Sequence, residues 1–426
     1  MYKVKKERVL LVGVDLKNKK KDRIDIKSSM GELKKLAEAA GGLVIENIIQ
    51  NKEKINPACY IGKGKAEEIA RYCEELNIDL IVFNDELSGT QLRNLEDIIG
   101  KRVIDRTAII LDIFAKRATT KEGKLQVELA QLKYRLPRLV GLGTELSRTG
   151  AGIGTRGPGE KKLEIDRRHI SSRINEVKNQ LKNIENIRKT KRTKRLNSRI
   201  PIVALVGYTN AGKSTLLNTI IKNNDDYKKE REVFTYDMLF ATLETNLRKA
   251  TLPNGQSILI TDTVGFVNKL PTHLIEAFKG TLEEVVYADL LLHVVDITNE
   301  NLDIQFDTTL KILRELGVDR KPTITVFNKI DRKRSTEINY NIKGPKSFIS
   351  AKEKMNTNEL LKLIEDSLPR QYYDVKLLIP FSESDIVSYL FDSTKVKEFK
   401  HTQKGTFIET TVNEIDYEKY KGYITE

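Results

Sequence analysis

Cysteine is scarce in this 426-residue chain, which contains only Cys59 and Cys73. Neither belongs to a CxxC motif or to a Cys/His cluster, so the sequence argues against structural zinc and against a disulfide scaffold. Scarce cysteine without such pairing is typical of a reducing, cytoplasmic setting, which we expect here.

Long apolar runs are missing as well. No run approaches the roughly 18 residues that a membrane-spanning helix needs. Lysines precede the short apolar run 9–12, but Asp15 and the lysines after it end the apolar part too early for a signal peptide. We therefore expect no membrane span and predict that the N-terminus forms a first strand.

Negative charge is in the minority, because 60 Asp and Glu face 74 Lys and Arg, a net charge of +14. Residues 160–199 alone hold 14 Lys or Arg against 5 Asp or Glu. This surplus predicts a polyanionic partner, and the segment lacks the Trp/Phe/Leu face of an interfacial membrane helix. RNA is the favoured partner. A hydrophobic content of 39% excludes a disordered protein, and the length predicts about three domains.

Residues 207–214 read Gly-Tyr-Thr-Asn-Ala-Gly-Lys-Ser, a complete GxxxxGK[ST] phosphate loop. The loop follows the apolar run 202–206 and precedes a helical stretch, which is the order that the motif requires. Its glycines let the backbone wrap a phosphate chain, and the helix N-terminus adds partial positive charge. Lys213 is predicted to reach the β- and γ-phosphates, and Ser214 to offer its hydroxyl to Mg²⁺.

A second motif, Asn-Lys-Ile-Asp at 328–331, indicates the base. A carboxylate accepts two hydrogen bonds, and guanine alone among the common bases presents paired N1–H and 2-amino donors. Asp331 therefore favours guanine over adenine. Asn328 and the stem of Lys329 are expected to brace the loop and cover the ring. Ser-Ala-Lys at 350–352 resembles the short loop that backs the guanine ring in GTPases.

A DxxG motif lies between these two, at 262–265. Asp262 is placed to hold a Mg²⁺-bound water, and the Gly265 amide to meet the γ-phosphate. For the switch threonine that completes the Mg²⁺ shell we choose Thr242, because it precedes an expected antiparallel strand pair at 244–251 and 257–262. Thr235 remains an alternative.

Two further side chains concern hydrolysis. Phe266 follows DxxG, where many GTPases carry a Gln that orients the attacking water. Phe has no donor or acceptor, so we expect hydrolysis to be slow in isolation and to depend on a partner, another loop or an ion. Asn210 could help to hold K⁺ against the phosphates, or it could only stabilise the loop by a local hydrogen bond. The group that activates the water is not identified.

The remaining sequence predicts three flanking parts. Residues 1–118 alternate apolar runs and helical patterns, which predicts a small α/β domain with a parallel sheet. Its strands are expected at 9–14, 43–49, 80–83 and 102–104, and its helices around 30–40, 65–76, 88–99 and 107–117. The turn 61–65, Ile-Gly-Lys-Gly-Lys, could bind an anion or be a plain strand–helix turn.

Residues 119–199 are predicted to form an antiparallel helical hairpin, followed by a basic linker. Each helix has a narrow apolar seam with 3-4 spacing, carried by Leu125, Leu129, Leu132 and Leu136 and by Leu163, Ile170, Ile174, Val177, Leu181 and Ile184. The glycine-rich connection carries Arg148 and Arg156, which suits contact with folded RNA, although a flexible linker is the alternative. Candidate RNA contacts are Arg148, Arg156, Lys161, Lys162, Arg167 and Arg168.

Together these patterns predict a multidomain α/β protein. A P-loop GTPase domain with a mostly parallel sheet is expected at 200–369, after the N-terminal α/β domain (1–118) and the hairpin (119–199). A small α/β C-terminal domain is expected at 370–426, with a strand at 375–379, a helix near 383–392 and strands at 395–400 and 405–413.

The chain resembles the HflX family of ribosome-associated GTPases over nearly its full length. The resemblance is carried by residues 60–65 (Tyr-Ile-Gly-Lys-Gly-Lys), by the glycine-rich stretch 148–160, and by Phe-Ala-Thr-Leu at 240–243 before Asp-Thr-Val-Gly-Phe at 262–266. The glycine-rich stretch is the most specific of these. The family pattern usually has Asp after Phe-Ala-Thr-Leu, whereas this chain has Glu244, which keeps the charge.

The resemblance implies binding to the large ribosomal subunit through its rRNA, splitting of stalled or idle ribosomes under stress, and Mg²⁺ held by Ser214 and Thr242. We expect a monomer when the protein is free. The expected GTP contacts are Gly207, Tyr208, Thr209, Asn210, Ala211, Gly212, Lys213, Ser214, Phe240, Ala241, Thr242, Leu243, Glu244, Asp262, Thr263, Val264, Gly265, Asn328, Lys329, Ile330, Asp331, Ser350, Ala351 and Lys352. Alternatives are a ribosome-assembly GTPase, or a GTP-regulated RNA-modifying or metabolic enzyme, although the sequence offers no second catalytic cluster outside 207–352.

Overall fold

The computed structural model describes residues 6–16, 25–141, 158–196, 200–222, 247–269, 271, 274, 279–299, 301–332, 344–368, 372–394 and 396–425. The chain divides into two compact units. One comprises Met1–Ala250 and Leu259–Thr357, and the other comprises Thr251–Ile258 and Asn358–Glu426. Within the described part of the chain, every helix is too short or too polar to span a lipid bilayer.

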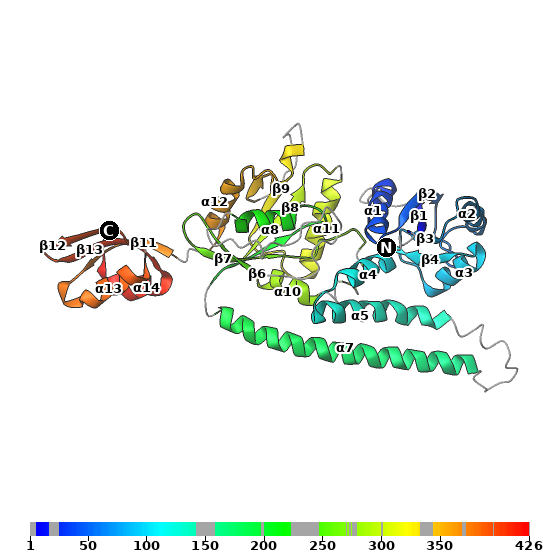
Figure 1. Ribbon diagram of the computed structural model, residues 1–426, viewed down its shortest axis with the longest axis horizontal. Helices are drawn as coiled ribbons and strands as arrows, with labels where there is room; N and C mark the ends of the chain where they lie inside the picture. The colour runs from blue at the N-terminus through cyan, green and yellow to red at the C-terminus, as the bar shows by residue number, and fades with distance from the viewer. Residues whose placement is uncertain are drawn as a thin grey trace, which may run out of the picture. The chain divides into compact units, whose positions relative to one another are not determined.

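The first unit begins with a four-stranded sheet whose recorded pairings are all parallel, in the order β2-β1-β3-β4. Its elements are β1 (Arg8–Leu16), α1 (Ile26–Ala39), β2 (Leu43–Lys52), α2 (Lys63–Glu75), β3 (Leu80–Phe83), α3 (Gly89–Ile99), β4 (Arg102–Asp105) and α4 (Arg106–Arg117) (Figure 1). Alternate residues of β1 enter two different hydrophobic clusters, Val9 and Leu11 in one and Leu10 and Val12 in the other. Burial on both faces explains why this strand is an unbroken apolar run. The predicted order of strands and helices and the parallel sheet are confirmed.

A helical hairpin follows, formed by α5 (Lys121–Arg135) and α7 (Pro158–Leu196). Arg173 of α7 pairs with Glu128 of α5 at 2.6 Å, and Arg188 of α7 pairs with Glu122 of α5 at 2.9 Å. The residue numbers of the α5 partners therefore decrease as those of the α7 partners increase. The two helices are therefore antiparallel, as predicted. Their seam is a separate cluster with Leu125, Leu129, Ile174 and Val177 at its centre.

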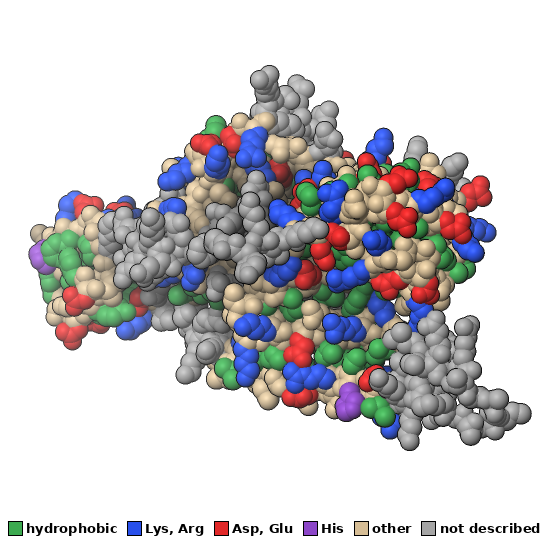
Figure 2. All heavy atoms as spheres, turned by 45° about the vertical axis from the view of Figure 1, so that its right-hand side comes forward, with side chains coloured by type: hydrophobic (Ala, Val, Ile, Leu, Met, Phe, Trp, Pro, Cys, Tyr) green, Lys and Arg blue, Asp and Glu red, His purple; other side chains and the backbone are tan. Residues whose placement is uncertain are grey.

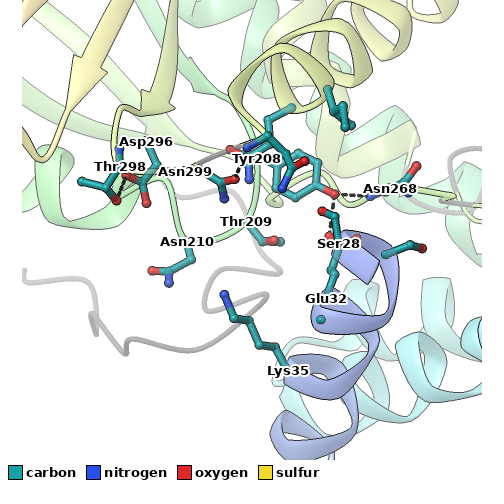
Figure 3. A pocket seen from close by; sticks show the side chains of 15 residues that line it. Ser28, Glu32, Lys35, Tyr208, Thr209, Asn210, Asn268, Asp296, Thr298 and Asn299 are labelled. Carbon is teal, nitrogen blue, oxygen red and sulfur yellow. Dashed lines mark hydrogen bonds between the residues drawn. The ribbon is translucent and has the colours of Figure 1, made fainter. Parts of the chain in front are cut away.

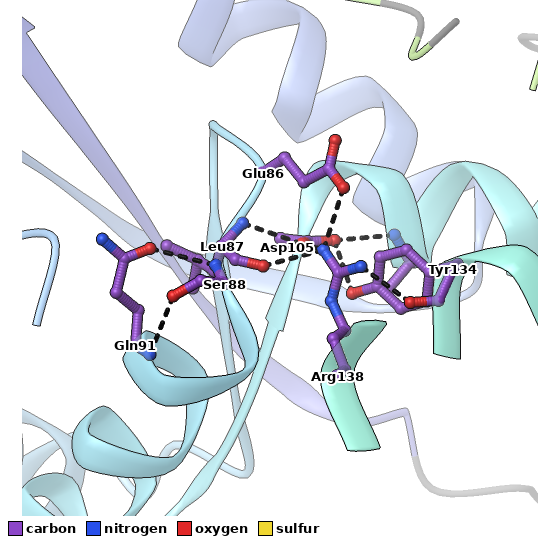
Figure 4. A network of polar contacts seen from close by, with 8 residues as sticks. Glu86, Leu87, Ser88, Gln91, Asp105, Tyr134 and Arg138 are labelled. Atoms are coloured by element: carbon purple, nitrogen blue, oxygen red, sulfur yellow. Dashed lines mark hydrogen bonds and ion pairs between the residues drawn. The ribbon is translucent and has the colours of Figure 1, made fainter. Parts of the chain in front are cut away.

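The end of α5 is fixed to the N-terminal sheet through Arg138, in the short helix η1 (Leu136–Gly141) (Figure 4). One guanidinium nitrogen of Arg138 lies 3.0 Å from the Asp105 carboxylate and 2.7 Å from the Leu87 carbonyl oxygen, and its carbon lies 3.5 Å from the centre of the Tyr134 ring. Asp105 is fully buried and also accepts hydrogen bonds from the Tyr134 hydroxyl and from two backbone amides. This network holds the hairpin at a defined place on the N-terminal sheet.

The second sheet has six strands in the order β10-β9-β8-β5-β7-β6. Its strands are β5 (Ile202–Val206), β6 (Leu247–Thr251), β7 (Ser257–Asp262), β8 (Leu290–Asp296), β9 (Thr323–Asn328) and β10 (Lys346–Phe348), and its helices are α8 (Lys213–Lys222), α10 (Lys279–Tyr287) and α11 (Leu302–Glu315). The recorded pairings of β5, β7, β8, β9 and β10 are parallel. Their carboxyl ends therefore meet at one edge, where open α/β sheets bind ligands.

The other unit contains α12 (Thr357–Ser367) and an antiparallel sheet in the order β12-β13-β11-β14. Its further elements are β11 (Tyr372–Ile379), η4 (Phe381–Glu383), α13 (Ser384–Ser393), β12 (Val396–Thr402), β13 (Gly405–Asn413), α14 (Glu414–Tyr420), η5 (Lys421–Tyr423) and β14 (Ile424–Thr425). The predicted three strands and the helix near 383–392 are present. The helix α14 and the two-residue strand β14 were not predicted.

Candidate nucleotide-binding site

The phosphate loop connects β5 to α8, and two of its glycines adopt a backbone that other residues avoid. Gly207 has φ +144° and Gly212 has φ +93°. A Cβ on Gly212 would lie 2.2 Å from Asn328 Nδ2, so the loop requires glycine here for space as well as for conformation. The Lys213 ammonium lies beneath the loop and donates to the carbonyl oxygens of Gly207 (3.0 Å) and Tyr208 (2.8 Å). Burial lowers the pKa of Lys213 to about 8, against an opposing contribution from Asp262.

Ser214 and Asp262 supply oxygens suited to a magnesium ion. The Ser214 hydroxyl donates directly to the Asp262 carboxylate, which is buried at the end of β7. A hydroxyl and a carboxylate that face each other at the mouth of a phosphate loop are the oxygen donors that Mg²⁺ prefers. The residues present therefore fit Mg²⁺, which when bound would neutralise charge on the phosphate oxygens. Thr242, the other expected ligand, and its alternative Thr235 lie outside the described residues.

The DxxG segment is held against the phosphate loop by its backbone. Phe266 N donates to Gly207 O (3.1 Å), and Thr209 N donates to Phe266 O (2.8 Å). A Cβ on Gly265 would lie 2.8 Å from Thr209 Cα, so this close approach also requires glycine. The Phe266 side chain is 1% exposed and belongs to the core of the second sheet. Phe266 therefore points away from the nucleotide side of the loop and anchors the segment.

The segments expected to hold guanine meet at Asn328. The Asn328 amide donates to Ala211 O (2.9 Å) and accepts from Ala351 N (3.0 Å), so it joins the phosphate loop to the segment 350–352. Lys329 Nζ donates to Asn210 O (2.8 Å) and to the Asp296 carboxylate (2.7 Å). These contacts provide the bracing predicted for Asn328 and Lys329. Asp331 lies in the short helix η3 (Ile330–Arg332), directly after this junction.

Several predicted site residues are not placed. Outside the described residues lie Thr235, Phe240, Ala241, Thr242, Leu243, Glu244, Arg148 and Arg156. Lys161 and Lys162 fall within α7. Arg167 and Arg168 are exposed on α7, where Arg168 pairs with Glu164.

Sequence reasoning missed a cavity of about 390 Å³ beside the phosphate loop (Figure 3). Helix α1 forms one side of it, and Tyr208, Thr209 and Asn210 form another. The Tyr208 hydroxyl donates to Glu32 on α1 (2.5 Å) and accepts from Asn268 N (2.6 Å). The only sequence signal for this contact was a tyrosine at a variable position of the phosphate-loop motif.

These features define a P-loop GTPase. Three family models match the chain: "GTP-binding GTPase N-terminal" at residues 27–115, "GTP-binding GTPase Middle Region" at 117–195 and "50S ribosome-binding GTPase" at 202–329.

Among curated proteins, the chain is 47% identical over 419 residues to the GTPase HflX of Caldanaerobacter subterraneus, covering 98% of this chain and 94% of that one. It is 46% identical to the GTPase HflX of Lacrimispora saccharolytica, covering 95% and 93%. The chain belongs to the HflX family of GTPases. Among solved structures, a complex of SsGBP and GDP is 26% identical with a TM-score of 0.46, covering 84% of this chain and 98% of that one.

Proposed function

We propose that this GTPase is a cytoplasmic factor that binds the large ribosomal subunit through its rRNA and splits stalled or idle ribosomes under stress. The observation that carries the proposal is the combination, in one chain, of the phosphate-loop, DxxG and NKxD motifs with a long basic helical hairpin. We divide the chain into four parts, at 1–118, 119–199, 200–369 and 370–426. In this proposal the first two parts contact RNA, and the third binds GTP or GDP.

The hairpin supports an RNA contact through its charge. Figure 2 shows Lys and Arg side chains recurring over the hairpin, with fewer acidic ones between them. Arg167 and Arg168 are exposed near its glycine-rich end, and guanidinium groups bind phosphates with directed pairs of hydrogen bonds. We propose these two, with Arg148, Arg156, Lys161 and Lys162, as the RNA contacts.

Sedimentation with ribosomes tests this proposal. With a non-hydrolysable GTP analogue, the protein should co-migrate with the large subunit, and intact ribosomes should shift toward separate subunits. The double variant Arg167→Glu, Arg168→Glu should lose co-migration because it reverses two charges on the hairpin. The matched control Lys311→Glu, Arg314→Glu places the same change on exposed positions of α11. Absence of the native protein from the large-subunit fraction would refute the proposal.

We further propose that Mg²⁺ is held by Ser214, Thr242 and, through water, Asp262, and that K⁺ is held beside Asn210. Asn210 lines the cavity next to the phosphate loop and has φ +60°, a left-handed backbone. GTP hydrolysis in KCl should then be faster than in NaCl at equal ionic strength. Equal rates in the two salts would refute the K⁺ site.

A further inference from the structure

The cavity beside the phosphate loop has one side from a distant part of the chain. Helix α1 contributes Ser28, Glu32 and Lys35, which recur at four and three residues and so share one helix face. Its other face is packed into the N-terminal core through residues that include Met30, Leu33, Leu36 and Ala37. The amphipathic pattern of α1 therefore turns its polar face toward the phosphate loop.

Helix α1 is fixed in this orientation by buried polar contacts. Glu32 accepts a hydrogen bond from the Tyr208 hydroxyl and forms an ion pair with Arg106, whose side chain is 2% exposed. Arg106 also donates to Asn84 Oδ1 (3.0 Å). Removing either partner of this ion pair would leave a charge in a largely buried site, so the orientation of α1 is strongly held. Lys35 lies three residues beyond Glu32, and Figure 3 shows its ammonium end directed toward Asn210.

Three residues that line the cavity carry hydrogen-bond donors for which the described residues provide no partner. Thr209 and Asn268 are 6% and 7% exposed, and among the described residues Thr209 Oγ1 and Asn268 Nδ2 have no hydrogen-bond partner. No ion pair is recorded for Lys35 within the same residues. The acidic groups of the cavity are engaged, Glu32 as above and Asp296 with Lys329. Lys35, Thr209 and Asn268 all line this cavity, so it is bordered by one cationic side chain and by two residues with unpartnered donors, a composition that suits an anion.

We propose that Lys35, Thr209 and Asn268 form a phosphate subsite on the flank of the phosphate loop, which takes the terminal phosphate of GTP during hydrolysis or the inorganic phosphate that leaves. The subsite rests on the GTPase activity and is independent of the ribosomal proposal. In hydrolysis the water oxygen bonds to the γ-phosphorus while the bond to the bridging oxygen breaks, and the products are GDP and phosphate. Negative charge is spread over these oxygens in the transition state, where a nearby cation is most effective. Because Phe266 is buried in the core, Lys35 would supply from α1 a charge that the DxxG segment does not provide.

Single-turnover GTP hydrolysis without ribosomes tests the subsite. Lys35→Met should lower the rate by about 10-fold or more, because a cation supplied to the transferred phosphate has a large effect on the rate. Lys35→Arg should keep most of the rate, since the charge remains, and Thr209→Val should lower it without changing side-chain shape. The affinity for GDP should stay within about 2-fold for both Lys35 variants, because GDP lacks the terminal phosphate. Lys34→Met is the matched control: Lys34 is the neighbouring exposed lysine on α1, does not line the cavity, and should leave the rate unchanged.

Inhibition by added inorganic phosphate separates the two sources of the ligand. A slower single turnover in Lys35→Met assigns the subsite to the terminal phosphate of GTP. An unchanged single turnover with weakened phosphate inhibition assigns it to the released product. If Lys35→Met changes neither, or accelerates hydrolysis, the subsite is refuted. Each variant is measured in KCl and in NaCl, so that the proposed K⁺ site and the Lys35 subsite can be told apart. Loss of the K⁺ site would change the ratio of the rates in the two salts, whereas loss of the Lys35 charge would lower the rate in both.

Discussion

The Tyr208 hydroxyl lies 2.5 Å from a carboxylate oxygen of Glu32, although the two residues are 176 positions apart. The same hydroxyl accepts the Asn268 amide, so one oxygen joins the phosphate loop, helix α1 and the segment after DxxG. Burial, and then the neighbouring Glu32 charge, raise the pKa of Tyr208, which keeps the hydroxyl protonated as a donor to Glu32. The DxxG segment is thus held by the N-terminal domain as well as by the phosphate loop, and Val264 and Val267 are buried in the N-terminal core cluster.

Tyr208→Phe should remove the hydrogen bonds that join these three segments while leaving the ring in place. Removing the hydroxyl leaves the buried Asn268 amide without a partner and Glu32 with one fewer donor, at a cost of about 1–3 kcal/mol in the free energy of unfolding. We expect a lower melting temperature by several degrees and slower single-turnover hydrolysis.

Tyr72→Phe is the control, because Tyr72 is 40% exposed on α2 and its hydroxyl should contribute little. A double-mutant cycle with Lys35→Met adds a sharper criterion: if Tyr208 positions Lys35, the effect of Lys35→Met on the rate should shrink in the Tyr208→Phe background. Purely additive effects, or a Tyr208→Phe protein that melts and hydrolyses like the native one, would contradict this role.

Gly212→Ala should abolish tight nucleotide binding. The new Cβ would lie 2.2 Å from Asn328 Nδ2, in a residue whose φ of +93° already disfavours a side chain. Relief of the clash must move the phosphate loop or Asn328, and a strain of a few kcal/mol corresponds to a loss of roughly 100-fold in affinity for GDP. Gly317→Ala is the control, because Gly317 also has positive φ (+70°) but nothing lies within 4 Å of the added Cβ. A titration with a fluorescent GDP analogue decides, and similar affinities for the two variants would show that the clash is unimportant.

Arg138→Lys should loosen the hairpin on the N-terminal sheet. Lysine keeps the charge near Asp105, but it cannot reproduce the planar fork that reaches Asp105, the Leu87 carbonyl and the Tyr134 ring together (Figure 4). We expect a loss of about 1–3 kcal/mol in stability and faster amide hydrogen exchange in α5. Arg135→Lys, one turn earlier and exposed, should change neither quantity. Equal exchange in the two variants would show that the Asp105 network does not hold the hairpin.

Local and periodic signals account for what the sequence predicted correctly. The central strands β1 and β3 are buried on both faces, which makes them unbroken apolar runs, and the hairpin repeats its apolar seam every three or four residues. The nucleotide-binding motifs are contiguous and lie at strand ends, so their meeting at one sheet edge follows from parallel topology. The strand β14 has two residues and is too short to show a period.

The contacts that the sequence could not reveal are those between distant side chains. Glu32 looks like an ordinary solvated acid on an amphipathic helix, and nothing near it in the chain indicates a contact with Tyr208. In the sequence, Phe266 indicates only that the usual Gln is missing. The structure adds that its ring is a core anchor, which depends on how Val206 and Leu282 pack around it and not on the motif. Tertiary packing, and not local pattern, decides such roles.

Asp331→Asn should change which base the protein selects. The carboxylate is expected to accept the N1–H and 2-amino donors of guanine, and an amide would replace one acceptor by a donor. Affinity for GDP should therefore fall by roughly 100-fold, while xanthosine diphosphate, which has a carbonyl oxygen in place of the 2-amino group, should bind better than it does to the native protein. Asp307→Asn, on the exposed face of α11, is the control and should keep the native preference. Competition titrations with the two diphosphates measure the ratio, and an unchanged preference for guanine in Asp331→Asn would mean that another residue contacts the base.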